Sequence, residues 1–261
     1  MTLSGNTILN TGGGSGIGLA LAEALKNEGN EVIVAGRSQS KLEHARKLGL
    51  KTLTVDMTDA ASIRKLAESA VKEFPALNFV IHNAGIMKNE KVTRTDNASI
   101  QEETVLTNLL GPMRLTEALL PHFLKQKSAV IMTVTSGLAY VPLALTPTYS
   151  ATKAAVHSYT ESLRYQLAGT SVEVKELVPP YVRTALMGDR QAADPNAMPL
   201  EEFISEVIKI MKETPAAPEI LVGRVMAQRS AAWSGEKAYG EFHKMMNDRL
   251  LAARKAEWEA L

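Results

Sequence analysis

The sequence contains no cysteine. This absence excludes disulfides, cysteine-ligated zinc or iron–sulfur sites and a thiol nucleophile, so any chemistry must come from other groups. An excess of charge of one sign is also missing, because 29 Lys and Arg residues stand against 28 Asp and Glu residues, for a net charge of +1. A balanced surface offers no general attraction for nucleic acid or anionic membranes, and we expect neither as a partner.

Long apolar runs are absent too, since no uninterrupted stretch approaches the ~20 residues that a membrane span requires. The first ten residues contain no basic segment followed by an apolar core, so no secretory signal is predicted. We therefore expect a cytoplasmic protein. The 261 residues, of which 45% are hydrophobic, are enough for one large globular domain.

Short β-rich segments alternate with longer helical ones, which is typical of a parallel sheet with crossover helices. Strands are predicted at residues 7–11, 31–35, 51–55, 78–82, 129–133, 172–178 and 219–222. Helices are predicted at residues 17–27, 41–48, 60–74, 100–125 and 148–168. Several strands are almost continuously apolar, as buried parallel strands are. The expected fold is α/β, a doubly wound parallel sheet of about seven strands with helices on both faces, and residues 1–261 form one domain.

The last third of the chain is less regular. Residues 185–200 show no clear periodicity and precede a helical segment at 201–212, so a substrate loop or lid is expected at about 185–213. Residues 237–261 are predicted to form a C-terminal helix. Its apolar face consists of Tyr239, Phe242, Met246, Leu250, Ala253 and Trp258. Two partners for this face stay open: the protein's own domain or a second subunit.

A glycine-rich turn follows the first predicted strand and leads directly into a helix. Its residues include Gly12, Gly14, Ser15, Gly16, Ile17 and Gly18. At such a junction, backbone N–H groups and the positive end of the helix dipole face an anion, usually the pyrophosphate of a dinucleotide. The strict G-x-G-x-x-G spacing is missing, and a plain turn is the alternative. The flanking strand and helix favour a dinucleotide-binding site.

The end of the second predicted strand indicates which dinucleotide is bound. An acid at this position usually holds the ribose hydroxyls, but the residues here are Gly36, Arg37 and Ser38. Because no acid repels a 2′-phosphate and an arginine can pair with it, NADPH is predicted in preference to NADH. The alternative is that Arg37 is only a solvated residue at the start of a helix.

Two further strand ends supply candidate cofactor-binding residues. They are Asp56 and Met57 after the third strand, and Asn83, Ala84 and Gly85 after the fourth. Asp56 could reach an adenine amino group, but Asp56 or Asp59 could equally cap the helix that follows. The glycine after the fourth strand would let the backbone approach a flat cofactor. His82 has no partner at metal-ligand spacing, so no metal site is expected.

Three side chains form a candidate reactive group. Ser136 stands at the end of the fifth strand, at the carboxyl edge where α/β sheets bind their ligands. Tyr149 and Lys153 are separated by one turn of the next predicted helix, so they share a face. A neighbouring ammonium favours the phenolate and would lower the tyrosine pKa from its usual value of about 10. Tyr149 is therefore the predicted proton donor.

These motifs, taken in order, resemble those of the classical short-chain dehydrogenase/reductase (SDR) superfamily, and most closely bacterial oxidoreductases of the Dlt type, which implies a Rossmann fold. Besides the glycine turn and the segment after the fourth strand, the match includes four residues that resemble the family's catalytic tetrad: Asn108, Ser136, Tyr149 and Lys153. Three residues after the sixth strand are implied to contact the nicotinamide: Pro179, Val182 and Thr184. His82 and Pro180 depart from the family's usual Asn and Gly, and neither is a reacting group.

The resemblance implies a role for each member of the tetrad. Tyr149 would act as general acid or base on a carbonyl oxygen, while Lys153 would lower its pKa and bind the nicotinamide ribose. Ser136 would orient the carbonyl and stabilise charge on its oxygen. Asn108 would hold a water that links Lys153 to solvent, and a helix-distorting polar residue is the alternative for this position.

The expected activity is hydride transfer between NADP(H) and a ketone or aldehyde, or the corresponding alcohol. The mouth of the site should be lined by residues 137–143, Leu186, Met187 and Met198. Their apolar character predicts an apolar or aromatic substrate, although Arg183 and Arg190 nearby weaken that prediction. The alternatives are an NADP-binding regulatory protein and a nucleotide-sugar epimerase or dehydratase. Family members are commonly dimers or tetramers, which implies a homo-oligomer.

Overall fold

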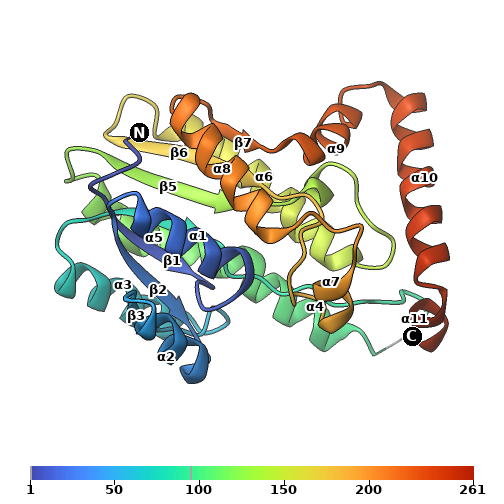
Figure 1. Cartoon of the computed structure of the whole chain (residues 1–261), viewed down its shortest axis with the longest axis horizontal. Helices are drawn as coiled ribbons and strands as arrows, with labels where there is room; N and C mark the ends of the chain where they lie inside the picture. Colours follow the sequence, from blue (N-terminus) through green and yellow to red (C-terminus); the bar gives the residue numbers. More distant parts are fainter. Residues whose placement is uncertain (1, 95) are drawn as a thin grey trace.

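A seven-stranded sheet forms the centre of the computed structural model, which describes residues 2–94 and 96–261 (Figure 1). Its strands are β1 (Thr7–Thr11), β2 (Glu31–Gly36), β3 (Lys51–Thr54), β4 (Leu77–His82), β5 (Ala129–Val134), β6 (Val172–Val178) and β7 (Glu219–Leu221). They are ordered β3-β2-β1-β4-β5-β6-β7, and every neighbouring pair is parallel. The chain order reverses between β1 and β4, and sheets of this type bind ligands at the carboxyl ends of the strands beside that point.

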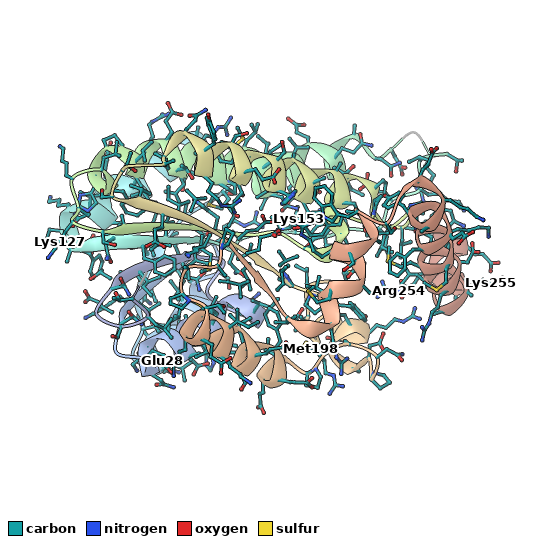
Figure 2. The ribbon with its side chains drawn as sticks, turned by 90° about the horizontal axis from the view of Figure 1, so that it is seen from above. Glu28, Lys127, Lys153, Met198, Arg254 and Lys255 are labelled. Atoms are coloured by element: carbon teal, nitrogen blue, oxygen red, sulfur yellow. The ribbon has the colours of Figure 1, made fainter. Side chains whose placement is uncertain are left out.

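Helices cover both faces of the sheet, as the view from above shows (Figure 2). One layer contains α1 (Gly16–Asn27), α2 (Gln39–Lys47) and α8 (Leu200–Glu213), which share one apolar core. The other layer contains α3 (Ala60–Glu73), α5 (Gly111–Phe123) and α6 (Pro147–Gln166), which share a second core. The predicted doubly wound α/β fold is confirmed, and each predicted strand ends within one residue of its expected bounds.

The composition of the inner strands explains why they lie inside. The sequence of β5 is AVIMTV, and all of its residues are buried, as expected for a parallel strand with helices on both faces. Asn10 is a buried polar exception on β1. Its Nδ2 donates to the carbonyl oxygen of Gly18 at 2.8 Å, which joins the strand to the start of α1.

The predicted helix at 100–125 is not continuous, so this prediction was wrong in detail. The structure has α4 (Ala98–Val105), a π-helical segment (Leu106–Leu110) and then α5. Pro112, in the first turn of α5, has no N–H to donate to the preceding turn, so the α-helical pattern of hydrogen bonds cannot pass through unchanged. Helical segments of this kind frequently occur at functional sites.

The C-terminal region differs from its prediction in two places. α7 (Asp189–Ala193) lies within the predicted loop at 185–200, and α9 (Met226–Ala231) follows β7. The predicted C-terminal helix is divided at Arg254 into α10 (Glu236–Ala253) and α11 (Lys255–Ala260), because the Arg254 side chain is buried and its backbone leaves the helical conformation.

α10 stands beyond the carboxyl ends of the strands (red in Figure 1). Three residues of its predicted apolar face, Tyr239, Phe242 and Met246, pack against the protein's own core. Intramolecular packing is therefore confirmed for this part of the face. Across residues 2–94 and 96–261, the structure contains no helix with the length and apolar character needed to cross a membrane.

Candidate active site

The glycine turn between β1 and α1 is held in shape by close backbone contacts. Gly12 and Gly16 have positive φ angles of 69° and 54°, a region that favours glycine. A Cβ on Gly12 would lie 2.7 Å from Cα of Ala84, so the turn packs directly on the segment after β4. The Asn83 carboxamide donates to the carbonyl oxygens of Thr11 and Gly12 at 3.2 and 3.3 Å. The predicted residues Asn83 and Ala84 therefore support the turn.

The first turn of α1 presents backbone amides that fit an anion. Ser15 is the N-cap residue, but its hydroxyl accepts a hydrogen bond from Nζ of Lys41 at 3.2 Å and, within the described ranges, does not cap the helix amides. The first turn also contains no acidic residue. The other predicted residues lie around the turn: Gly14 against Lys41, Gly16 against Thr184, and Ile17 against the core. These features favour the anion site over a plain turn.

Two cations stand near the carboxyl end of β2. Nη1 of Arg37 lies 4.0 Å from Asp56 and 3.8 Å from Glu103, so Arg37 is not simply solvated. Both ion pairs are long and partly exposed, and such pairs are weak, so the guanidinium can still take another anion. Ser38 caps α2, its Oγ accepting from the backbone N–H of Lys41. Lys41 is the second cation, and its place four residues after Arg37 is the signal that sequence reasoning missed.

Of the two acids that the sequence offered as helix caps, Asp59 caps the helix, and the adenine contact of Asp56 stays a prediction. Oδ1 of Asp56 accepts from the backbone N and the hydroxyl of Thr58 at 2.9 and 2.8 Å. Partial burial opposes ionisation, but these bonds lower the pKa of Asp56 overall. Asp59 caps α3 by accepting a backbone N–H at 2.8 Å. The Met57 side chain is buried in the core against Gly111, so only its backbone is placed to contact a nucleotide.

His82, a departure from the family's usual residue, has a structural environment. It is buried at the end of β4, and its Nε2 lies 2.8 Å from the hydroxyl of Thr116. Burial lowers the pKa of His82 to about 4, so its ring is neutral at physiological pH. The difference from the family therefore adds no charge beside the site.

Ser136, Tyr149 and Lys153 meet at the carboxyl end of β5. α6 carries Tyr149 and Lys153 one turn apart, and all three side chains are buried (Lys153 is labelled in Figure 2). The Ser136 side chain lies close enough to the Tyr149 hydroxyl to oppose the rise in its pKa. Nζ of Lys153 donates to the carbonyl oxygen of Val134 at 2.6 Å and lies 5.6 Å from the centroid of the Tyr149 ring. The structure thus brings the predicted reactive residues together.

Asn108 approaches this group from the π-helical segment. Its carboxamide accepts from the backbone N and donates to the backbone O of Ile86, both at 2.9 Å, and donates to Thr152 Oγ1 at 3.2 Å. A Cβ on Gly85 would lie 3.4 Å from Oδ1 of Asn108 and 3.8 Å from Nζ of Lys153. Asn108 therefore fixes the backbone beside the ammonium. The water link stays a prediction, and the helix distortion considered as its alternative is present.

Burial governs the ionisation of Tyr149 and Lys153. It raises the pKa of Tyr149 to about 12, while the Ser136 side chain acts in the opposite direction. It lowers the pKa of Lys153 to about 8, and the negative charge of Glu176 opposes that change. The net pKa of Tyr149 is therefore raised and not lowered, because burial outweighs the opposing effects. Tyr149 is protonated at neutral pH, which is the state a proton donor requires.

The segment after β6 carries the remaining predicted cofactor-binding residues. The carbonyl oxygen of Pro179 accepts from the backbone N–H of Gly137 at 3.0 Å, which joins the ends of β6 and β5. Gln191, which is buried, donates to the carbonyl oxygen of Val182 at 2.8 Å and to Thr184 Oγ1 at 3.2 Å. Sequence reasoning missed Gln191, because a lone glutamine in an irregular segment matches no motif.

One residue assigned to the mouth of the site lies in the core, so that prediction was wrong. Met198 is fully buried, because it forms a bridge with Val182 and packs in the core. The Tyr140 hydroxyl donates to Oε1 of Glu219 at 2.9 Å, and its place at the mouth stays a prediction. Leu186 is 43% exposed and follows Thr184 closely, which keeps it a candidate for contact with substrate.

α10 and α11, here named the C-terminal strap (residues 236–260), hold the loops around the site. Asn247 accepts from the backbone N–H of Ala144 at 2.6 Å, which anchors the loop between β5 and α6. Arg254 is only 6% exposed, and its Nη2 donates to the Tyr181 hydroxyl at 3.1 Å, which anchors the segment after β6. The apolar pattern of the C-terminal helix did not reveal either anchor.

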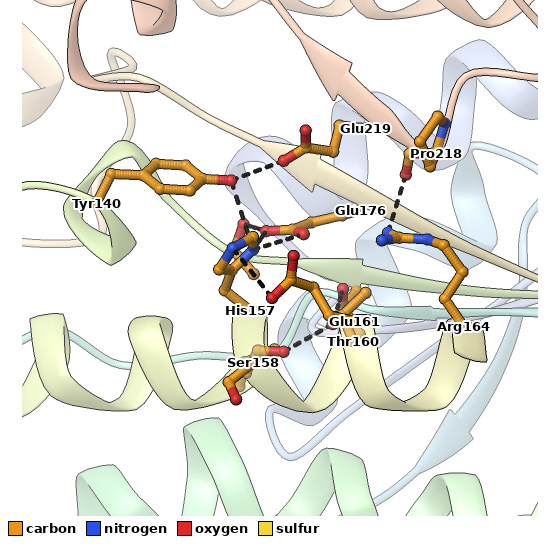
Figure 3. Close-up of polar contacts among 12 residues, drawn as sticks. Tyr140, His157, Ser158, Thr160, Glu161, Arg164, Glu176, Pro218 and Glu219 are labelled. Atoms are coloured by element: carbon orange, nitrogen blue, oxygen red, sulfur yellow. Dashed lines mark hydrogen bonds and ion pairs between the residues drawn. The ribbon is translucent and has the colours of Figure 1, made fainter. Parts of the chain in front are cut away.

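A largely buried polar cluster, also missed, lies between α6, β6 and β7 (Figure 3). It consists of Tyr140, His157, Glu176, Glu219 and Arg229. The sequence of β6 is VEVKELV, and Glu176 is its fully buried acid, which the charged residues Glu173 and Lys175 beside it concealed at the level of sequence. Ligand atoms of His157, Glu176 and Glu219 lie within 4.8 Å of one another, a spacing that a metal ion could use. Arg229 and Tyr140 already bond to the Glu219 carboxylate, so the cluster balances its charges from within.

Comparisons with known proteins agree with this architecture. Residues 6–195 match the family described as short chain dehydrogenase. "Uncharacterized oxidoreductase DltE" of Bacillus subtilis (strain 168) is 40% identical over 237 residues, which cover 88% of this chain and 93% of the relative. The chain therefore belongs to the short-chain dehydrogenase family, a family of oxidoreductases, and the resemblance to Dlt-type members is confirmed.

Two solved structures show the same fold. A 3-oxoacyl (acyl-carrier-protein) reductase of Agrobacterium tumefaciens C58 with NADP bound has a TM-score of 0.69 and 26% identity, covering 78% of this chain and 86% of its own. A short chain dehydrogenase/reductase of Burkholderia phymatum in complex with NAD has a TM-score of 0.72 and 21% identity, covering 88% and 93%. At that identity, the second likeness shows the fold alone.

Proposed function

We propose that the protein transfers a hydride between NADP(H) and a ketone or aldehyde, or the corresponding alcohol. The observation that carries this proposal is the buried Tyr149 side chain, whose ring centroid lies 5.6 Å from the Lys153 ammonium one helical turn away and which is buried together with Ser136. This group stands at the carboxyl edge of the sheet, where the fold binds its ligands.

The glycine turn fits a dinucleotide cofactor. Gly12 and Gly16 provide the positive φ angles of the turn, and the amides at the start of α1 can receive a pyrophosphate. Thr184 lies against Gly16, so the segment after β6 borders the glycine turn, and its residues Pro179, Val182 and Thr184 would hold the nicotinamide part of the cofactor. A bound nicotinamide cofactor supplies the hydride, and the protein supplies position and electrostatics.

Each tetrad residue then has a physical task. The protonated Tyr149 hydroxyl donates to the carbonyl oxygen during reduction and takes the proton back during oxidation. The Ser136 hydroxyl stabilises negative charge that grows on that oxygen. The Lys153 ammonium stabilises the phenolate left behind and binds the cofactor ribose. Asn108 holds the backbone beside that ammonium through its two bonds to Ile86.

Two cations support a preference for NADP(H). Arg37 stands at the carboxyl end of β2 with only weak acidic partners, and Lys41 reaches the glycine turn through Ser15. Both are exposed and available to a 2′-phosphate, which pairs well with a guanidinium. A higher kcat/KM with NADH than with NADPH would contradict this preference.

The arginines near the site favour a neutral substrate, because both have other partners. Nε of Arg183 donates to the carbonyl oxygen of Asp194 at 3.3 Å. Arg190 pairs with Glu257 and donates to the carbonyl oxygen of Ala253 at 2.6 Å. We therefore propose an apolar or aromatic carbonyl compound as substrate. A cytoplasmic location and a homo-oligomeric state stay predictions, which cell fractionation and sedimentation would test.

The test follows NADPH absorbance with a panel of neutral aliphatic ketones, aromatic ketones and anionic keto acids. Tyr149→Phe removes the proposed acid and should lower kcat/KM by about 10²- to 10⁴-fold. The matched control is Tyr165→Phe on the same helix, whose side chain is 87% exposed and whose activity should not change. Equal activity of Tyr149→Phe and the wild type would refute the proposal, and turnover of the keto acids alone would refute the substrate class.

A further inference from the structure

Glu176 is a fully buried carboxylate in β6 with a defined set of partners (Figure 3). Its Oε1 accepts from the hydroxyl of Thr135, which directly follows β5, at 2.6 Å. Both of its oxygens lie near Nδ1 of His157 on α6, at 3.0 and 2.9 Å. A carboxylate removed from water in this way must be stabilised by nearby donors and cations.

The partners of Glu176 adjoin those of Lys153. His157 follows Lys153 by one turn of α6, so the two side chains share a face of the helix. Thr135 directly follows Val134, whose carbonyl oxygen accepts from the Lys153 ammonium. Through Thr135 and His157, the Glu176 carboxylate is thus joined to the two segments that hold the ammonium, and its negative charge acts on Lys153.

The other charges around Glu176 are paired among themselves. On β7, Glu219 accepts from Arg229 of α9 at 3.0 and 3.1 Å, and Tyr140 donates to the same carboxylate. On α6, Glu161 lies 3.9 Å from Nε2 of His157 with a side chain that is 60% exposed. Three cations therefore act on the Glu176 charge: His157, when protonated, Lys153, and Arg229, which is already bonded to Glu219.

We propose that Glu176 is a positioning residue for Lys153: its buried charge keeps the ammonium charged beside Tyr149, and His157 holds the carboxylate in place. The inference rests on the proposed function, because it assumes that the reaction and cofactor binding need the charged form of Lys153. It adds to the tetrad a fifth residue, which acts through Lys153 and does not touch the substrate.

The test is Glu176→Gln, which removes the charge and keeps an oxygen that can accept from Thr135. Burial already lowers the pKa of Lys153 to about 8, and Glu176 opposes that change. Removing the negative charge disfavours the ammonium, so the pKa of Lys153 should fall further. The basic limb of the pH profile, measured for kcat and for NADPH affinity from about pH 6 to 10, should move to lower pH by about one unit.

Two variants separate charge from structure. In Glu161→Gln, an exposed carboxylate of the same sign is lost, and the basic limb should not move. In His157→Gln, a neutral donor still holds Glu176, so the limb should stay or move to higher pH. The proposal would be overturned if the basic limb of Glu176→Gln lay at the same pH as that of the wild type. It would also be overturned if the basic limb moved to lower pH by the same amount in Glu176→Gln and His157→Gln. Thermal unfolding of each variant confirms that it is folded.

The NADPH measurement also distinguishes this proposal from the proposed function. The fluorescence of bound NADPH gives the cofactor affinity at each pH, so the ionisation of Lys153 can be followed without any catalytic turnover. If the wild type binds NADPH but reduces no carbonyl compound, the proposed function fails while the effect of Glu176 on the limb is still measured. A wild type that binds no NADPH at all contradicts both.

Discussion

The two halves of the sheet build their parts of the site from different groups. Beside β1 to β3, the glycine turn relies on backbone: Gly12 and Gly16 have positive φ, and α1 offers its first amides. Beside β4 to β6, the site relies on buried polar side chains, among them Ser136, Lys153 and Glu176. The half beside β1 to β3 therefore depends on glycines that have no side chain. The half beside β4 to β6 depends on polar and charged side chains whose burial costs free energy.

This difference predicts different responses to mutation. A substitution in the backbone-built half should disturb stability and cofactor binding together, because the turn packs on the rest of the fold. A substitution in the half built from side chains should remove activity and leave the fold and most of the cofactor affinity intact. Buried polar groups at functional sites commonly oppose local stability in this way.

The largest effect is expected for Lys153→Met, which replaces the ammonium with an apolar group of similar length. kcat should fall by about 10²- to 10⁴-fold, because the phenolate loses its stabilising charge. NADPH affinity should weaken by no more than about tenfold, the effect of one hydrogen bond. Stopped-flow turnover and NADPH fluorescence measure the two quantities, and a variant that retains wild-type kcat would contradict the comparison.

Gly12→Ala tests the backbone-built half. The new Cβ would lie 2.7 Å from Cα of Ala84 at a φ of 69°, so the turn must shift. Unfolding free energy should fall by about 1–3 kcal/mol, and NADPH affinity should fall with it. The control is Gly36→Ala, where no described atom lies within 4 Å of the added Cβ. If urea unfolding showed equal stability for both variants, the glycine turn would not depend on the missing side chain of Gly12.

Arg37→Ala tests whether the residue at the end of β2 selects NADPH over NADH. kcat/KM with NADPH should fall roughly tenfold, because a charge-assisted bond to the 2′-phosphate is lost, while kcat/KM with NADH should not change. Arg46→Ala, on the exposed side of α2, serves as the control and should leave both values unchanged. If kcat/KM fell by the same factor with NADPH and NADH, Arg37 would not bind the 2′-phosphate.

The smallest effect is expected for Arg254→Ala in the C-terminal strap. Loss of its bond to Tyr181 should loosen the segment after β6 and raise the KM for the carbonyl substrate roughly fivefold, with NADPH affinity unchanged. The neighbouring Lys255→Ala, whose side chain is 75% exposed, is the control. If both variants have the wild-type KM, the strap does not shape the substrate site.

The parts of the molecule that sequence analysis predicted are those with local signals. Apolar runs such as residues 130–134 predicted strands, because buried parallel strands need no alternation. The glycine turn was predicted because it stands between a strand and a helix. Ser136, Tyr149 and Lys153 were recognised from their position and from the family resemblance, and the structure brings them together.

Other features depend on contacts between distant segments, which no local pattern contains. Asn108, in the π-helical segment, is bonded to Ile86, which precedes it by 22 positions. Arg254 breaks the C-terminal helix where its side chain reaches Tyr181. Glu176 resembled an ordinary strand residue, because only the pairing of β5 with β6 places its charge where it acts on Lys153.

The most direct measurement is a crystal structure of the protein with NADPH bound. The pyrophosphate should rest on the first turn of α1, and the C4 carbon of the nicotinamide should face the Tyr149 hydroxyl with room for one carbonyl group between them. A nucleotide bound elsewhere, or a Tyr149 hydroxyl turned away from C4 in that complex, would contradict the proposed chemistry.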